Sequence, residues 1–106
     1  MSAFEIYIYY VSWGTDGKFR PVLFFSQKGQ KVSVFTITTK YETKSDKIKA
    51  NFFKIIDWIQ AGLSRQSYID AKSLRKIPVS LLQNPIEKLT ERDATRFISF
   101  LAENPN

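Results

Sequence analysis

Residues 21–39 read PVLFFSQKGQKVSVFTITT, and this stretch decides the fold class. Its two ends, residues 21–26 and 31–39, are rich in β-branched and aromatic side chains, which favour strands. Residues 31–39 also alternate between apolar and polar positions, with the period of two that is typical of a half-buried strand. Residues 27–30 surround Gly29 and form a turn signal between them. A short turn between two strands predicts an antiparallel pair.

A further strand is expected before this pair, at residues 4–13 (FEIYIYYVSW). Alternation places Phe4, Ile6, Ile8 and Tyr10 on one face of it and Glu5, Tyr7, Tyr9, Val11 and Trp13 on the other. Both faces are apolar or aromatic, as expected in a strongly curved small barrel or at an interface. Gly14 to Gly17 read as the turn to the next strand. The three strands together predict an antiparallel meander.

The middle of the chain is less regular. Residues 41–50 (YETKSDKIKA) are polar, and we expect a mobile loop there. Residues 51–63 fit either a helical stripe or a short strand ending at Asp57, and the pattern alone slightly favours the helix. Residues 68–72 read as a short strand. The following prolines, Pro78 and Pro85, predict turns or a single helical turn.

A one-sided helix of about three turns is predicted at the C-terminal end. Thr90 can cap its N terminus, with Glu91 and Asp93 in the first turn, where the helix dipole favours acids. The apolar stripe recurs at Ala94, Phe97, Ile98 and Leu101, and Pro105 ends the helix.

Length and composition restrict the functions to be considered. The 106 residues predict one domain covering residues 1–106. The sequence has no cysteine and no histidine, which excludes disulfides, imidazole metal sites and histidine-based triads. We therefore expect no metal and no cofactor. The first apolar run is short and contains Glu5, so we expect neither a signal peptide nor a membrane span, and a cytoplasmic protein.

The chain carries a net charge of +6. Its lysines are concentrated in one stretch, at Lys40, Lys44, Lys47, Lys49 and Lys54. Such a surface suits a polyanion, but lysines also serve as a solubilising face, and charge alone leaves both interpretations open.

Four motifs resemble the MazF/PemK/Kid toxins of type II toxin–antitoxin systems. Residues 17–23 (GKFRPVL) are similar to the G-x-x-R-P-x-L that opens the family's second strand, and residues 37–39 (ITT) to its I-T-[ST]. Residues 57–77, from Asp57 through Gly62 and Ser67 to the run LRKI, match the family's D-x4-G-x4-S and I-R-T-I. Residues 86–93 (IEKLTERD) resemble the I-G-K-L-S-E-E-D before its C-terminal helix. The motifs keep the family's order and cover nearly the whole chain.

The resemblance implies an α+β, mainly β fold: a small SH3-like antiparallel β-barrel of the MazF/CcdB kind with a C-terminal helix. It also implies a strand at residues 52–56, against the pattern's preference for a helix. The implied activity is metal-independent, sequence-specific cleavage of single-stranded mRNA by attack of the ribose 2′-OH on the adjacent phosphate. The implied partners are single-stranded RNA, a second copy in a homodimer and a cognate antitoxin.

Four residues are the catalytic candidates that the resemblance implies. Arg20 matches the family's active-site arginine, and its guanidinium fork can hold two phosphoryl oxygens; alternatively it is a surface arginine beside Pro21. Thr38 matches a catalytic-site threonine, and is otherwise an ordinary strand threonine. Asp70 and Lys72 stand two apart, where Kid-like members have an Arg and an Asp as acid and base. They are either such a pair or a structural ion pair.

The substrate-binding candidates surround these positions. They are Trp13, Thr15, Asp16, Lys18, Thr39, Lys40, Ser67 and Arg75. The family's first loop reads RNA and holds a glutamate five residues before the arginine; here that position is Thr15, next to Asp16, in a shorter loop. Trp13 stacks a base or packs in the core. Arg75 matches an arginine of the family, whose role is in binding, in structure or at the dimer interface.

An alternative function on the same barrel is a CcdB-like poison that binds DNA gyrase and has no nuclease activity, because fold does not choose between the two. The pairing of Arg20-Pro21 with Thr38 favours the nuclease, since the gyrase poisons are not expected to share it. A degenerate binding module that has lost catalysis is a third possibility.

Overall fold

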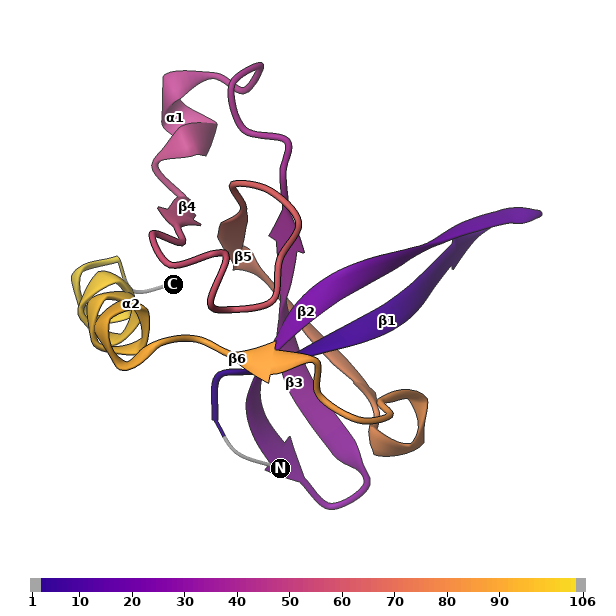
Figure 1. The fold of residues 1–106 in the computed structure, drawn as a ribbon. Helices are drawn as coiled ribbons and strands as arrows, with labels where there is room; N and C mark the ends of the chain where they lie inside the picture. Colours follow the sequence, from indigo (N-terminus) through magenta and orange to yellow (C-terminus); the bar gives the residue numbers. More distant parts are fainter. Residues whose placement is uncertain (1–2, 105–106) are drawn as a thin grey trace.

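The structure is a computed structural model that describes residues 3–104, apart from the side chains of Val11 and Trp13. Six strands form one antiparallel sheet, in the order β4-β5-β3-β2-β1-β6, that curls around a C-terminal helix (Figure 1). The strands are β1 (Glu5–Trp13), β2 (Asp16–Lys28), β3 (Lys31–Thr38), β4 (Phe52–Lys54), β5 (Tyr68–Pro78) and β6 (Glu87–Lys88). The helices are α1 (Asp46–Lys49), the short 3-10 turn η1 (Val79–Leu81) and α2 (Glu91–Glu103). The predicted meander and C-terminal helix are confirmed.

The hairpin of β1 and β2 is longer than the sequence indicated. Trp13 pairs with Asp16, so the turn is only Gly14-Thr15, and Gly14 has the positive φ of 58° that favours glycine. The hairpin therefore extends beyond the rest of the sheet as a projecting arm (Figure 1). Near its tip, the ring of Tyr10 lies directly over Gly17, where any side chain would collide with it.

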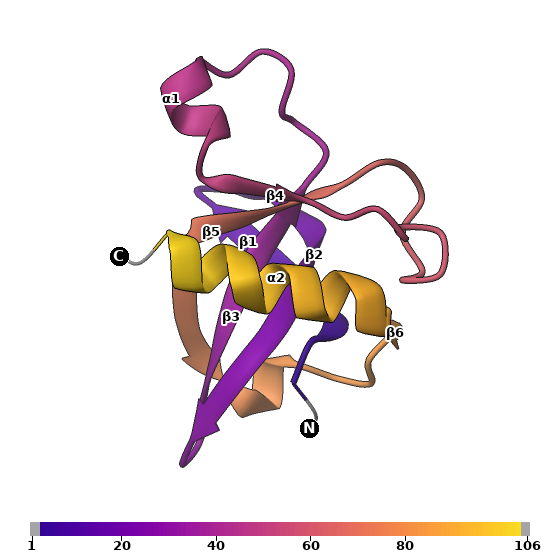
Figure 2. The ribbon, with the colours of Figure 1, turned by 90° about the vertical axis from the view of Figure 1, so that its left-hand side faces the viewer.

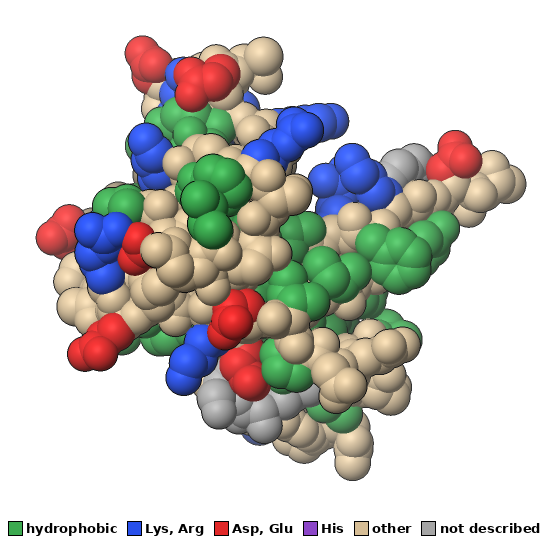
Figure 3. Space-filling view, viewed as in Figure 1, with side chains coloured by type: hydrophobic (Ala, Val, Ile, Leu, Met, Phe, Trp, Pro, Cys, Tyr) green, Lys and Arg blue, Asp and Glu red, His purple; other side chains and the backbone are tan. Residues whose placement is uncertain are grey.

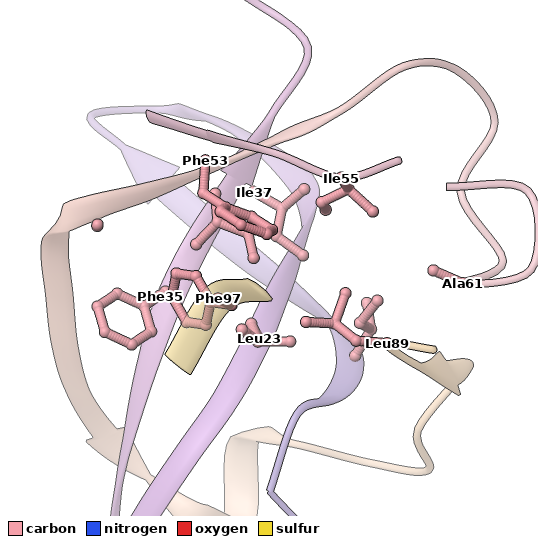
Figure 4. Packing of buried hydrophobic residues seen from close by; sticks show 11 residues of the cluster. Leu23, Phe35, Ile37, Phe53, Ile55, Ala61, Leu89 and Phe97 are labelled. Carbon is pink, nitrogen blue, oxygen red and sulfur yellow. The ribbon is translucent and has the colours of Figure 1, made fainter. Parts of the chain in front are cut away.

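Helix α2 lies across one face of the sheet and closes the larger core cluster (Figure 2). Its buried residue Phe97 contacts Phe35 and Phe53 edge to face, with ring centroids 5.3 and 5.1 Å apart (Figure 4). Thr90 caps the helix as predicted, because its hydroxyl accepts a hydrogen bond from the Asp93 amide at 3.3 Å. The predicted stripe is wrong at Ile98, which is 55% exposed. Position 98 lies about 100° around the helix from Phe97, outside the face that points to the sheet.

The other face of the sheet carries a second buried cluster. It consists of Tyr7, Val22, Phe24, Val32, Val34, Ile77 and Leu82. Tyr7 is only 2% exposed. Burial and a hydrogen bond to Glu5 raise the pKa of Tyr7 to about 12. The exposed side chains of β1 instead include Ile8 and Tyr10, which alternation had placed on the opposite face.

The segment between β3 and β5 differs from its prediction in two ways. Residues 41–50 are not entirely loop, because α1 forms there with Ser45 as its N-cap. The helix favoured for residues 51–63 is wrong; the strand implied by the family resemblance is present, but it ends at Lys54. It ends there because the amides of Ile56 and Asp57 donate to the buried carboxylate of Asp93, at 3.2 and 2.7 Å, instead of continuing a ladder.

Strand β5 extends to Pro78, well beyond the predicted residues 68–72. Its pairing with β3 shifts register between Ile69 and Leu74, so the residues between them bulge from the ladder. The predicted single helical turn follows Pro78 as η1. No helix within residues 3–104 is long and apolar enough to cross a membrane.

Candidate active site

The strands β2 and β3 part at one end of the sheet and leave an opening. They pair from Lys28 with Lys31 as far as Val22 with Thr36. Beyond that point β2 follows β1 into the projecting arm, whereas Thr38 of β3 pairs with Tyr68 of β5 (Figure 1). A cavity of about 320 Å³ occupies the opening, between residues 18–21 of β2, residues 37–39 and the loop of residues 63–67.

Arg20 and Thr38 lie on opposite sides of this opening, two residues beyond the last pair of their strands. Both also line a second cavity of about 340 Å³. Arg20 is half-buried, and no ion pair or hydrogen bond engages its guanidinium among the side chains that the structure describes. The Thr38 hydroxyl accepts a hydrogen bond from the Lys40 amide at 3.1 Å, which leaves its own proton free to donate. The two side chains can therefore both donate to one anion.

Six of the eight residues that line the second cavity are polar or charged, and cations outnumber acids. The lining residues are Arg20, Thr36, Ile37, Thr38, Lys44, Phe52, Asp70 and Arg75. Three cationic side chains thus face one carboxylate. The excess of positive charge suits a phosphate group, and the hydroxyls of Thr36 and Thr38 add neutral donors.

Of the predicted pair Asp70 and Lys72, only Asp70 lines a cavity of the opening. Asp70 lines the second cavity beside Arg20, whereas Lys72 lines neither cavity. The two positions were expected to share a strand face, but the bulge in β5 removes the alternation on which that expectation depended. The Asp70 carboxylate stabilises the bulge by accepting from the Lys72 amide at 3.1 Å and the Ser73 hydroxyl at 2.9 Å.

The predicted substrate-binding residues are distributed around the opening. Lys18, Thr39 and Ser67 line the first cavity, and Arg75 lines the second. Ser67 is buried, and its hydroxyl donates to the Arg65 carbonyl at 2.9 Å, so it also shapes the loop.

The other predicted binding residues lie away from the two cavities. Lys40 is exposed and borders neither one, although its amide holds Thr38. Thr15 and Asp16 are exposed at the tip of the arm. The Trp13 side chain lies outside the described residues.

Sequence reasoning missed several residues of the two cavities. Phe19, Leu63, Ser64 and Arg65 line the first, and Thr36, Lys44 and Phe52 line the second. Lys44 belongs to the lysine-rich stretch, which was a usable signal. The others have no local pattern, because their position depends on how distant segments meet.

The remaining motif residues form the scaffold of the cavity wall. Asp57 accepts hydrogen bonds from the Arg92 guanidinium and from the Thr90 hydroxyl, the latter at 2.6 Å. These partners, Arg92 first, hold the pKa of Asp57 below its ordinary value. Gly62 has a φ of +77° that favours glycine, and a Cβ at this position would lie only 3.2 Å from the Glu87 Cβ. These contacts fix the loop that carries residues 63–67.

No protein-family model matches this chain, and no curated protein sequence matches it significantly. Solved structures do match. The Mycobacterium tuberculosis toxin MazF-mt6 is 22% identical, with a TM-score of 0.70 over 93% of both chains. A second M. tuberculosis toxin is 20% identical, with a TM-score of 0.63 over 91% of this chain and 97% of that one.

A mycobacterial endoribonuclease, solved in complex with its cognate antitoxin, is also similar in structure. It is 16% identical, with a TM-score of 0.61 over 92% of this chain and 88% of that one. The chain therefore shares the fold of the MazF toxins across nearly its whole length, as the motifs had implied.

Proposed function

We propose that this chain is the toxin of a type II toxin–antitoxin system, an endoribonuclease that cuts single-stranded mRNA without a metal ion. The fold shared with MazF toxins and an endoribonuclease supports the proposal. The observation that carries it is the half-buried guanidinium of Arg20, which no described side chain engages, near the Thr38 hydroxyl in an opening with other cations around it. That arrangement is suited to an oxyanion that gains charge during a reaction.

The chemistry needs only protein side chains, the RNA and water. The ribose 2′-oxygen forms a bond to the adjacent phosphorus while the bond from phosphorus to the 5′-oxygen breaks. The products are a 2′,3′-cyclic phosphate and a free 5′-hydroxyl. Arg20 and Thr38 donate to the non-bridging oxygens, whose charge is greatest in the transition state.

Two protons must move in this step. The 2′-hydroxyl loses one, and the leaving 5′-oxygen gains one. Asp70 is the candidate acceptor, because its carboxylate lines the same cavity as Arg20 and Thr38. A donor from Lys72 would require that side chain to turn toward the cavity, so we assign the returning proton to solvent.

Replacing Arg20 by alanine tests the proposal. Cleavage of a long single-stranded RNA should slow by about a hundredfold or more, the usual loss for one preorganised charge donor. RNA binding should weaken far less, because other cations still meet the phosphates. Arg20→Lys should recover only part of the activity, since an ammonium lacks the planar fork. The measurements are mapped cut ends and equilibrium binding of an RNA with a 2′-deoxy sugar at the cut site, which should bind and resist cleavage.

Lys28→Ala is the control for charge, because Lys28 is exposed at the opposite end of β2. It should cut RNA at the wild-type rate. Arg20→Ala protein that still arrests growth while cellular mRNA stays intact would favour a gyrase poison instead. Equal losses of binding and cutting would reduce Arg20 to a phosphate anchor.

The proposal includes a cytoplasmic location and two protein partners. One is a cognate antitoxin, as in the complex of the mycobacterial endoribonuclease. The other is a second copy of this chain. A groove along the arm gives a surface for one of these contacts (Figure 3); it is lined by Ile8, Tyr10, Phe19, Leu81 and Ile86 together with the polar residues Gln83 and Asn84. Groups of large exposed apolar side chains of this kind mark protein interfaces.

A further inference from the structure

Phe52 is an aromatic residue that lies outside the hydrophobic core. It lies on β4, an edge strand of the sheet. Its neighbour Phe53 points into the larger core cluster, so alternation turns Phe52 to the other face. Phe52 belongs to neither buried cluster and is half-exposed. It pairs across the ladder with Asp70 and lines the same cavity as Arg20.

The lysine-rich segment after β3 is folded back over Phe52. The Lys44 ammonium lies 5.2 Å from the centre of the Phe52 ring, and Tyr41 meets that ring edge-on at 6.3 Å. Tyr41 in turn stacks flat on Tyr68, at 4.1 Å and 6° between planes. Lys49 lies 5.0 Å from the Tyr41 ring. These contacts hold Lys44 at the mouth of the cavity.

Charge across the cavity favours an anionic ligand with an aromatic part. Lys44 approaches from the segment between β3 and α1, Arg75 from β5 and Arg20 from β2. In Figure 3, basic side chains lie on both sides of the notch between the projecting arm and the segment that carries α1. A nucleotide has both parts: a flat base, which can stack on Phe52, and a phosphate, which can pair with the cationic side chains.

We propose that the second cavity is a nucleotide subsite beside the scissile phosphate; this rests on the proposed function. The base of the neighbouring nucleotide stacks on Phe52, and its phosphate meets Lys44 and Arg75. Arg20 and Thr38, which line both cavities, hold the phosphate that is cut. The cavity volume of about 340 Å³ is at the lower end of the range for small-molecule sites, roughly 300–1,000 Å³.

The subsite predicts a preference for an unpaired base but little discrimination among bases. Stacking on a phenylalanine face is open to every base, whereas a base within a duplex cannot reach it. The need to stack a base on Phe52 would therefore restrict the enzyme to single-stranded RNA. Sequence preference would have to come from residues elsewhere around the opening.

A double-mutant cycle on RNA affinity tests whether a base stacks on Phe52. The probe is a short fluorescein-labelled RNA with a 2′-deoxy sugar at the mapped cut site, together with two versions that lack the base on one or the other side of the cut. Phe52→Leu should weaken binding of the complete RNA about tenfold, or about 1.4 kcal/mol. One of the two abasic RNAs should bind the wild type about as weakly as the complete RNA binds Phe52→Leu. For that abasic RNA, Phe52→Leu should cause no further loss of affinity.

Matched variants control for folding and charge. Phe52→Tyr keeps the ring and should keep the affinity. Phe25→Leu changes another partly exposed strand phenylalanine, away from both cavities, and should bind as the wild type does. Lys44→Ala should lower the slope of log affinity against log salt by about one ion, whereas Lys28→Ala should lower it much less.

Two results would overturn the subsite. Phe52→Leu that weakens complete and abasic RNA by the same factor would show that Phe52 does not touch a base. If Phe52→Leu weakens only antitoxin binding, Phe52 contacts a protein partner and not RNA. If the wild type cuts RNA and Arg20→Ala does not, either result removes the subsite alone. A wild type that does not cut RNA removes the proposed function, and the subsite with it.

Discussion

Replacing Asp93 by alanine should destabilise the protein by about 2–6 kcal/mol, chiefly because two backbone amides lose their acceptor. The Asp93 carboxylate is fully buried and belongs to the first turn of α2. One oxygen accepts from the Ile56 amide at 3.2 Å and from Arg96 at 2.7 Å, and the other accepts from the Asp57 amide at 2.7 Å. Alanine removes all three acceptor contacts at once.

The magnitude follows from what the substitution leaves behind. The two amides lose their partner, and a buried donor without a partner costs about 1–3 kcal/mol. The Arg96 side chain is 38% exposed, so water can solvate its charge again, and it adds little to the loss. The combined loss from the two amides is a large part of the free energy of unfolding, which is about 5–15 kcal/mol in domains of this kind.

Urea unfolding at neutral pH, followed by circular dichroism, measures the loss directly. Glu91→Ala is the control, because Glu91 is an exposed acid in the same first turn of α2. It should cost at most about 1 kcal/mol, through the helix dipole alone. A loss below about 1 kcal/mol in Asp93→Ala, with an unchanged m-value, would refute the reasoning. Water would then satisfy the amides of Ile56 and Asp57.

Three further outcomes are expected. The pKa of Asp57 is held below its ordinary value of 3.8 by Arg92 and Thr90, so the contact stabilises the fold above that pH and is lost as pH falls through the lower, folded-state pKa. The difference in urea midpoint between wild type and Asp57→Asn should therefore shrink below pH 3.8 and stay constant near neutrality; a constant difference at all pH values would contradict it. RNA cleavage should persist in EDTA, because the sequence has no histidine or cysteine and the described residues hold no acidic group of three that could bind a metal; activity that disappears in chelator and returns with magnesium would contradict this. Light scattering at high micromolar concentration should show a dimer, and a charged substitution at Phe19, which is 67% exposed in the groove along the arm, should weaken it; a monomeric wild type would remove the homodimer from the proposal.

The candidate site was predictable where it depends on one short motif. Arg20 and Thr38 were selected on separate motifs, and the structure brings them to one opening, because β2 and β3 are neighbours and part just before these residues. Prediction failed where it depended on regular alternation. Asp70 and Lys72 were expected on one face of a regular strand, but β5 bulges between Ile69 and Leu74, and of the two residues only Asp70 lines the second cavity.

The faces of β1 show a related limit. Alternation identified two sets of side chains correctly, but both sets are apolar, so the pattern could not say which one is covered. The structure buries Tyr7 on one face under η1 and leaves Ile8 and Tyr10 partly exposed on the other. The reason is that η1 and β6, from the far end of the chain, pack beside this strand.

By itself the sequence determined the meander, the capped C-terminal helix, the absence of histidine chemistry and the arginine and threonine on which the proposed reaction depends. These features follow from short-range patterns: a period of two, a turn at Gly29, a cap at Thr90 and single motifs. The tertiary structure alone decided that β4 stops at Lys54, because the amides of Ile56 and Asp57 donate to Asp93, 37 and 36 positions away, instead of to a neighbouring strand. It alone also placed Phe52 and Lys44 in one cavity with Arg20, since the curled sheet brings β2, β3, β4 and β5 and the segment before α1 together there. No local pattern carries information about contacts at that separation, because they form only when the core closes.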